Sequence, residues 1–142
     1  MPTKSTRRKN KLAVQFAVPR RGLPSAAALL KWARAGAPSN EVTLRIVGMR
    51  EGRLLNKSFR RRDTPTNVLS FHYGGKRGDI VLCHPVIARE ARRQGKTLAA
   101  HYAHLVVHGM LHLRGHGHGK RMEQREISIL RRLGIANPYA VE

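Results

Sequence analysis

Three histidines in one short segment have the residue type and the spacing of a metal site. His108, His112 and His118 occur in the run HGMLHLRGHGH, four and then six residues apart, with Gly115 between the second and the third. Helical side chains four residues apart share one face, with Cβ atoms about 5–6 Å apart, so His108 and His112 can reach one ion. Gly115 allows the chain to leave the helix and turn, which would bring His118 back as a third ligand.

Three neutral imidazoles suit zinc, and a zinc ion with three protein ligands keeps a fourth position for water, as in catalytic sites. The pattern therefore predicts one Zn²⁺ ion per chain at a site capable of hydrolysis. His101 and His104 continue the histidine stripe towards the start of the same helix. We expect them to be structural, with support of the ligands or of the substrate as the alternative.

The same histidine spacing occurs in metalloproteases of the pattern H-E-x-x-H-x-x-G-x-x-H, where the glutamate beside the first histidine is the general base. Gly109 stands at that position here. Without the carboxylate, a peptidase lacks its proton acceptor. A protease is therefore the weakest of the hydrolytic hypotheses.

The elements that position the histidines are predicted from the spacing of apolar residues. In segment 97–115 apolar residues recur every three or four positions from Leu98 to Leu113, which predicts a helix with a core-facing stripe. The other expected elements are strands at 12–19, 41–48, 67–73 and 79–83, helices at 23–36, 85–95 and 119–134, and a short helix opening segment 51–63. The sequence thus predicts an α+β fold: a small mixed sheet of about four strands surrounded by about five helices, with the metal site at the end of a central helix.

Charge and length limit the function further. The chain has 142 residues, with 28 Lys and Arg against 8 Asp and Glu, a formal charge of +20 that favours RNA or another polyanion as partner. We expect a basic, disordered arm at 1–11 and a single domain at 12–142. Aromatic residues are only 5% of the chain, so recognition of backbone and shape is expected, without DNA specificity. A single cysteine, Cys83, and the lack of a long apolar run favour a cytoplasmic protein that does not bind membranes.

Four segments together resemble a known family. The runs NKSFRRRDTPTNVLSF (56–71), GDIVL (78–82), HGMLHLRGHGH (108–118) and the later MEQRE are similar to those of the YbeY endoribonucleases, also called rRNA maturation factors. The resemblance implies an α+β, zinc-dependent, single-strand-specific endoribonuclease. Its implied role is 3′-end maturation of 16S rRNA and ribosome quality control, with the rRNA precursor, the small ribosomal subunit and assembly factors as partners.

Carried over by position, the family's zinc ligands fall on His108, His112 and His118, and its functional arginine falls on Arg60. Lys57, Arg61 and His72 are weaker candidates for contacts with RNA. The acids Asp63 and Asp79 are expected in a turn and in a loop.

The chain departs from the family pattern at Gly117, where an aspartate usually precedes the third histidine, and in the basic stretch that follows. Because such an acid can orient a ligand or a water molecule, its absence keeps a second hypothesis open. In that hypothesis the zinc is structural, and the chain is a basic ribosome-assembly or RNA-binding factor with little hydrolytic activity.

Overall fold

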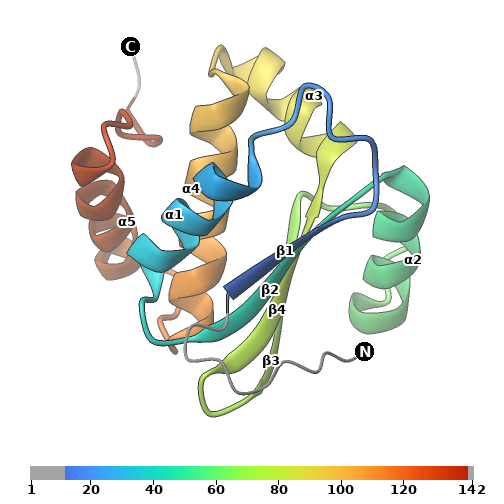
Figure 1. Cartoon of the computed structure of the whole chain (residues 1–142), viewed down its shortest axis with the longest axis horizontal. Helices are drawn as coiled ribbons and strands as arrows, with labels where there is room; N and C mark the ends of the chain where they lie inside the picture. Colours follow the sequence, from blue (N-terminus) through green and yellow to red (C-terminus); the bar gives the residue numbers. More distant parts are fainter. Residues whose placement is uncertain (1–11, 141–142) are drawn as a thin grey trace.

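A computed structural model describes residues 12–140, so the basic arm expected at 1–11 lies outside the described part (Figure 1). The four strands are β1 (Leu12–Phe16), β2 (Glu41–Val47), β3 (Val68–Gly74) and β4 (Arg77–Cys83). They form one sheet in the order β1-β2-β4-β3, in which β1, β2 and β4 are parallel and β3 runs antiparallel to β4. The sheet is therefore mixed, with β3 as an edge strand.

Five helices accompany this sheet, which confirms the predicted α+β fold: α1 (Ala26–Gly36), α2 (Met49–Arg60), α3 (His84–Gln94), α4 (Leu98–Leu113) and α5 (Lys120–Arg132). The Ser25 and Thr97 side chains cap α1 and α4 by accepting hydrogen bonds from backbone N–H groups. Helix α2 begins at Met49, two residues before the segment in which a short helix was predicted, and has 12 residues. The residue that follows the helix, Arg61, caps it in a left-handed conformation with a φ of 57°.

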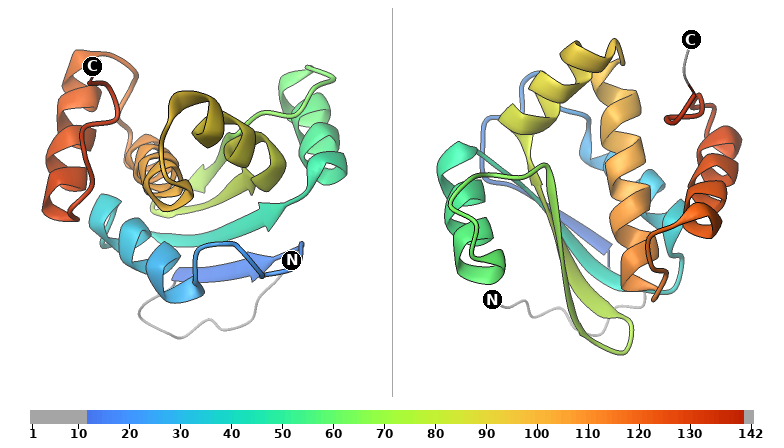
Figure 2. Two further views of the ribbon diagram at one scale, coloured as in Figure 1. Left: turned by 90° about the horizontal axis from the view of Figure 1, so that it is seen from above. Right: turned by 180° about the vertical axis from the view of Figure 1, so that it is seen from behind.

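The two faces of the sheet are covered differently (Figure 2). One face carries alternate side chains such as Leu44, Ile80 and Leu82, and it packs against α1 and α4 in the main core. The opposite face carries Val81 and its neighbours, which pack against α2 and part of α3 in a smaller cluster. Because each strand alternates its side chains between faces, α4 and α2 pack on opposite sides of the sheet.

Helix α4 lies against the sheet at very short range. A Cβ atom added at Gly109 would lie 2.9 Å from Cδ1 of Ile80 and 3.3 Å from Oγ of Ser70. The glycine therefore lets α4 approach β3 and β4 more closely than any other residue would. This contact fixes the part of α4 that carries His108 and His112.

One of the acids lies in a different element from the one that was expected. Asp79, expected in a loop, lies within β4, and its carboxylate accepts a hydrogen bond of 2.7 Å from the Tyr73 hydroxyl.

Between residues 12 and 140 the structure has no helix whose length and apolarity would suffice to span a membrane.

Candidate metal centre

The end of α4 and the loop that follows bring His108, His112 and His118 together. One ring nitrogen from each of the three lies within 4.8 Å of the others. Gly115, with a φ of 96°, adopts a left-handed conformation after the last turn of α4 and allows the chain to reverse. His108 and His112 are partly buried, whereas His118 is exposed, so the cluster opens to solvent on the side of the loop.

Hydrogen bonds fix which nitrogen of two imidazoles is free. His108 Nδ1 lies 2.5 Å from Oε2 of Glu126, and His112 Nδ1 lies 3.0 Å from the carbonyl oxygen of His116. A carbonyl oxygen and an ionised carboxylate can only accept, so both Nδ1 atoms carry the proton and donate it. The Nε2 lone pairs of His108 and His112 are then available to a metal ion, which is the usual arrangement of metal-binding histidines.

The protonation states also suit a metal ion. Burial lowers the pKa of His112, and the neighbouring imidazoles of His108 and His118 lower it further. The ring is therefore neutral near pH 7, and neutral imidazole is the form that binds a metal. Three imidazole nitrogens that converge in this way fit the donor set of a zinc ion.

The sequence analysis missed Glu126, whose buried carboxylate anchors the cluster. This side chain is 0% exposed, and it accepts hydrogen bonds from His108, from His104 Nε2 at 3.2 Å and from the Tyr139 hydroxyl. Burial alone would raise the pKa of Glu126, but these hydrogen bonds outweigh it and hold the pKa at about 2. The carboxylate is therefore ionised and orients His108.

His104, His108 and Glu126 also lie close enough to form a second group of metal-ligand atoms. In this group, however, Nδ1 of His108 already donates to the carboxylate, and Nε2 of His104 faces the same carboxylate. The hydrogen bonds therefore account for this group without an ion. His104 therefore contacts the carboxylate that orients the candidate ligand His108. This contact agrees with the alternative role expected for His104, support of a ligand.

His101 lies deeper in the protein, 3% exposed, and Nε2 of its ring lies 2.8 Å from Oε1 of Glu90. The Asn67 amide donates to the same oxygen at 3.0 Å. Glu90 thus links α3, α4 and the start of β3. His101 has the structural role expected for it.

Two glycines of the histidine segment have opposite environments. At Gly109 a Cβ atom would lie 2.9 Å from Cδ1 of Ile80 and 3.3 Å from Oγ of Ser70, so the glutamate that metalloproteases carry at this position would require these side chains to shift. At Gly117 a Cβ atom would meet nothing within 4 Å. Packing therefore disfavours a glutamate at position 109, whereas the family's usual aspartate would fit at Gly117.

The arginine carried over from the family lies on another helix. Arg60 is the last residue of α2 and is exposed, as are Lys57 and Arg61. None of the hydrogen bonds or ion pairs within residues 12–140 joins Arg60 to the three histidines. Edge strand β3 separates α2 from α4 when the molecule is seen from behind (Figure 2, right).

The segment after α2 is held in place by two polar contacts. The amide of Asn56, which is 2% exposed, donates to the Thr64 carbonyl oxygen at 2.6 Å. Asp63, expected to cap a turn, instead pairs its carboxylate with the Arg53 guanidinium at 2.8 Å. This pair lowers the pKa of Asp63. Both contacts tie the basic segment to α2 and so position Arg60.

The fold and the site define a class of protein: a basic α+β domain with a three-histidine site that fits zinc. A sequence model of the family described as "Endoribonuclease YbeY" matches residues 17–134. The chain therefore belongs to the YbeY endoribonuclease family.

Curated relatives agree over most of the chain. The protein named "Endoribonuclease YbeY" from Nitrosomonas eutropha is 46% identical over 142 aligned residues, which cover 92% of this chain and 99% of the relative. The protein of the same name from Methylibium petroleiphilum is 48% identical, with 92% of this chain and 94% of the relative covered. The solution structure of TM1509 from Thermotoga maritima is similar in fold, with a TM-score of 0.59 at 21% identity over 90% of this chain and 99% of that protein.

Proposed function

We propose that this protein is a zinc-dependent, single-strand-specific endoribonuclease that acts in 3′-end maturation of 16S rRNA and in ribosome quality control in the cytoplasm. Its partners would be the 16S rRNA precursor, the small ribosomal subunit and assembly factors. Membership of the endoribonuclease family supports an RNA substrate. The observation that carries the proposal is the convergence of His108, His112 and His118, with two Nδ1 protons already engaged.

Each residue has a definite task in this proposal. His108, His112 and His118 would hold one zinc ion, while Glu126 and the His116 carbonyl keep two of the rings in the required tautomer. Zinc, when bound, supplies Lewis acidity towards a phosphoryl oxygen and lowers the pKa of a water molecule from about 15.7 towards 7.

Arg60 would pair with the scissile phosphate through two parallel hydrogen bonds and neutralise the charge that develops there. Lys57, Arg61 and His72 would contact the RNA backbone. Edge strand β3 lies between α2 and α4, and its outer edge pairs with no other described strand. An RNA strand that crosses this edge would meet Arg60 on one side of the sheet and the histidines on the other.

A cleavage assay tests the proposal. A single-stranded RNA with the sequence around the 16S 3′ end would be incubated with the zinc-loaded protein, with the chelator-treated protein and with zinc-treated His112→Ala. We expect cleavage only in the first sample. The same RNA annealed to its complement should resist cleavage. Equal cleavage in all three single-strand samples would indicate a contaminating nuclease and contradict the proposal.

One observation favours the second hypothesis, an RNA-binding factor with a structural zinc ion. Among residues 12–140, the carboxylate in contact with the histidine cluster is that of Glu126, which accepts three hydrogen bonds and has its pKa lowered to about 2. A carboxylate with so low a pKa is a poor acceptor for the proton of an attacking water molecule. If the zinc-loaded protein binds the RNA with one equivalent of zinc but leaves it intact, this second function replaces the first.

A further inference from the structure

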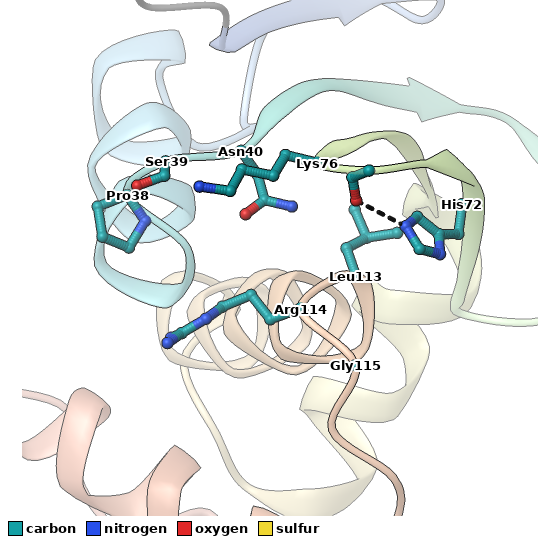
Figure 3. A pocket seen from close by; sticks show the side chains of 9 residues that line it. Pro38, Ser39, Asn40, His72, Lys76, Leu113, Arg114 and Gly115 are labelled. Atoms are coloured by element: carbon teal, nitrogen blue, oxygen red, sulfur yellow. Dashed lines mark hydrogen bonds between the residues drawn. The ribbon is translucent and has the colours of Figure 1, made fainter.

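A cavity of about 460 Å³ lies beyond the end of α4, where the loop before β2 meets the hairpin between β3 and β4 (Figure 3). This volume is within the range of roughly 300–1,000 Å³ typical of small-molecule sites. Its wall includes Leu113 and Arg114, which directly follow His112 in the chain. The cavity therefore adjoins the last turn of the helix that carries the candidate metal ligands.

Asn40 is the buried polar group of this cavity. It is 8% exposed, and its side-chain amide points into the cavity (Figure 3). The amide forms no hydrogen bond with another residue of 12–140, although the backbone N–H of Asn40 donates to the Ala37 carbonyl oxygen at 3.3 Å. Among the described residues, the fully buried side-chain atoms without a partner are on Asn56, His101 and His104, so the Asn40 amide keeps contact with the solvent in the cavity. Asn40 thus presents both a donor and an acceptor to a ligand.

The rest of the polar lining is basic. Lys76 extends across the cavity towards Asn40 (Figure 3), and it forms no ion pair within the described part of the chain. Arg114 donates one hydrogen bond of 2.9 Å to the Gly36 carbonyl oxygen, which leaves most of its five N–H donors for another acceptor. No acidic side chain is among the described residues that line the cavity. The cavity therefore favours an anion.

His72 completes the wall on the side of β3. Its Nε2 lies 3.0 Å from the Gly75 carbonyl oxygen, so this nitrogen donates, and Nδ1 is an acceptor whenever the ring carries a single proton. The cavity thus combines two cations, an amide, an imidazole and the apolar side chain of Leu113. A nucleotide matches this set, since its phosphate needs cations and its base and ribose need hydrogen-bond partners beside apolar surface.

We infer that this cavity binds one nucleotide of the single-stranded RNA next to the cleavage site. The phosphate would lie between Lys76 and Arg114, and the Asn40 amide would pair with a base edge or a ribose hydroxyl. The inference rests on the proposed function and deepens it, because it assigns part of RNA recognition to residues outside the metal centre and outside α2.

Binding measurements with matched variants test the inference. The affinity of a nuclease-resistant phosphorothioate RNA for the zinc-loaded protein would be measured by fluorescence anisotropy between about 50 and 200 mM salt. The variants are Asn40→Ala and Lys76→Gln. Lys31→Gln is the control, since it removes another exposed lysine, which lies on α1 and does not line the cavity. Thermal melting followed by circular dichroism would show whether each variant is folded.

Each variant has a distinct expected signature. Lys76→Gln should weaken binding several-fold and reduce the slope of log Kd against log salt by about 0.7, the value of one phosphate contact on a single strand. Asn40→Ala should also weaken binding several-fold but leave the slope unchanged, because the amide is neutral. Lys31→Gln should change both the affinity and the salt slope by less than Lys76→Gln does. If both cavity variants bind as tightly as Lys31→Gln, the inference is wrong.

A spectroscopic measurement separates this inference from the cleavage activity. The side-chain amide resonance of Asn40 should shift when the same RNA is added, while that of exposed Asn137 should not. An equal shift on addition of inorganic phosphate alone would mean an anion site without nucleotide recognition and would contradict the inference. If Asn40 responds to RNA but the wild type does not cleave, the nuclease proposal fails and the nucleotide site stands. If the wild type cleaves the RNA but the Asn40 resonance does not shift, the nuclease proposal stands and the nucleotide site is wrong.

Discussion

His108 and His112 are held on a helix packed against the sheet, whereas His118 lies on an exposed loop between Gly117 and Gly119. The first two rings each donate an Nδ1 proton to a defined acceptor. His118 has no hydrogen-bond partner among the described residues. Two of the candidate ligands are therefore oriented by hydrogen bonds within the protein, while the third, His118, is not, so we expect His118 to adjust its position when a metal ion binds.

The largest effect should come from removal of a helical ligand. His112→Ala should lose nearly all bound zinc, a greater loss than the roughly 10–100-fold typical of outer-shell partners. His118→Ala should keep weak binding, since two oriented rings remain. Metal analysis of freshly purified proteins, with about one equivalent of zinc in the wild type, would measure both. If His112→Ala and His118→Ala retained equal amounts of zinc, the proposed difference between the oriented helical histidine and the loop histidine would be wrong.

The next effect should come from the buried carboxylate. Glu126→Gln should lower the zinc affinity by about 10–100-fold, because the carboxylate offers separate oxygens to His108 and to His104, whereas the neutral amide keeps only one of these two acceptors. Tyr139→Phe, which removes one donor to Glu126 and leaves the carboxylate in place, should have a smaller effect. Competition with a chromogenic chelator measures the affinity without any RNA. An unchanged affinity in Glu126→Gln would exclude the orienting role.

Two glycine substitutions should differ in stability. Gly109→Ala should reduce the free energy of unfolding by about 1–2 kcal/mol, because the clash with Ile80 exceeds the gain in helix propensity. Gly117→Asp, in open space, should change it by less than about 0.5 kcal/mol. Urea denaturation of the metal-free proteins gives both values. If Gly109→Ala were as stable as the wild type, close packing of α4 against the sheet would not require glycine at this position.

The smallest expected effect is a pH dependence of stability in the buried part of α4. Burial lowers the pKa of His101 below 6.5, although the hydrogen bond with Glu90 opposes it, and burial likewise lowers the pKa of His84. The unfolded chain therefore binds protons before the folded one as the pH falls through about 6.5, so the free energy of unfolding decreases there.

Urea denaturation of the metal-free protein from about pH 7.5 to about pH 5.5 would show this decrease. His101→Gln should show a shallower decrease, since one of the imidazoles whose pKa burial lowers is gone. A wild-type stability that rises towards pH 5.5 would contradict the assigned direction of the shifts.

Most of the fold followed from local patterns. The apolar stripe and the spacing of His108 and His112 were enough to predict α4, and Gly115 was enough to predict a turn after it. Asp79 was misplaced because β4 extends back to Arg77 through a short hairpin turn. The start of α2 was missed because Met49 and Arg50 follow Gly48 without a capping side chain.

The partners of the site could not be read from the sequence. Glu126 follows His108 by 18 residues on another helix, and their contact depends on how α4 and α5 pack. The same holds for Asn40, whose burial depends on the hairpin and on the end of α4. Local periodicity gives the face of a helix but not the identity of the element that covers it.

The contact between Tyr139 and Glu126 joins the segment after α5 to the carboxylate that orients His108. A carboxypeptidase that trims the chain back past Tyr139 would leave every candidate ligand intact, yet it would take one hydrogen bond from the acid behind His108. The metal affinity would then depend on whether the segment with Tyr139 is present. A preparation in which only some of the molecules have been trimmed would contain two populations with different zinc occupancy.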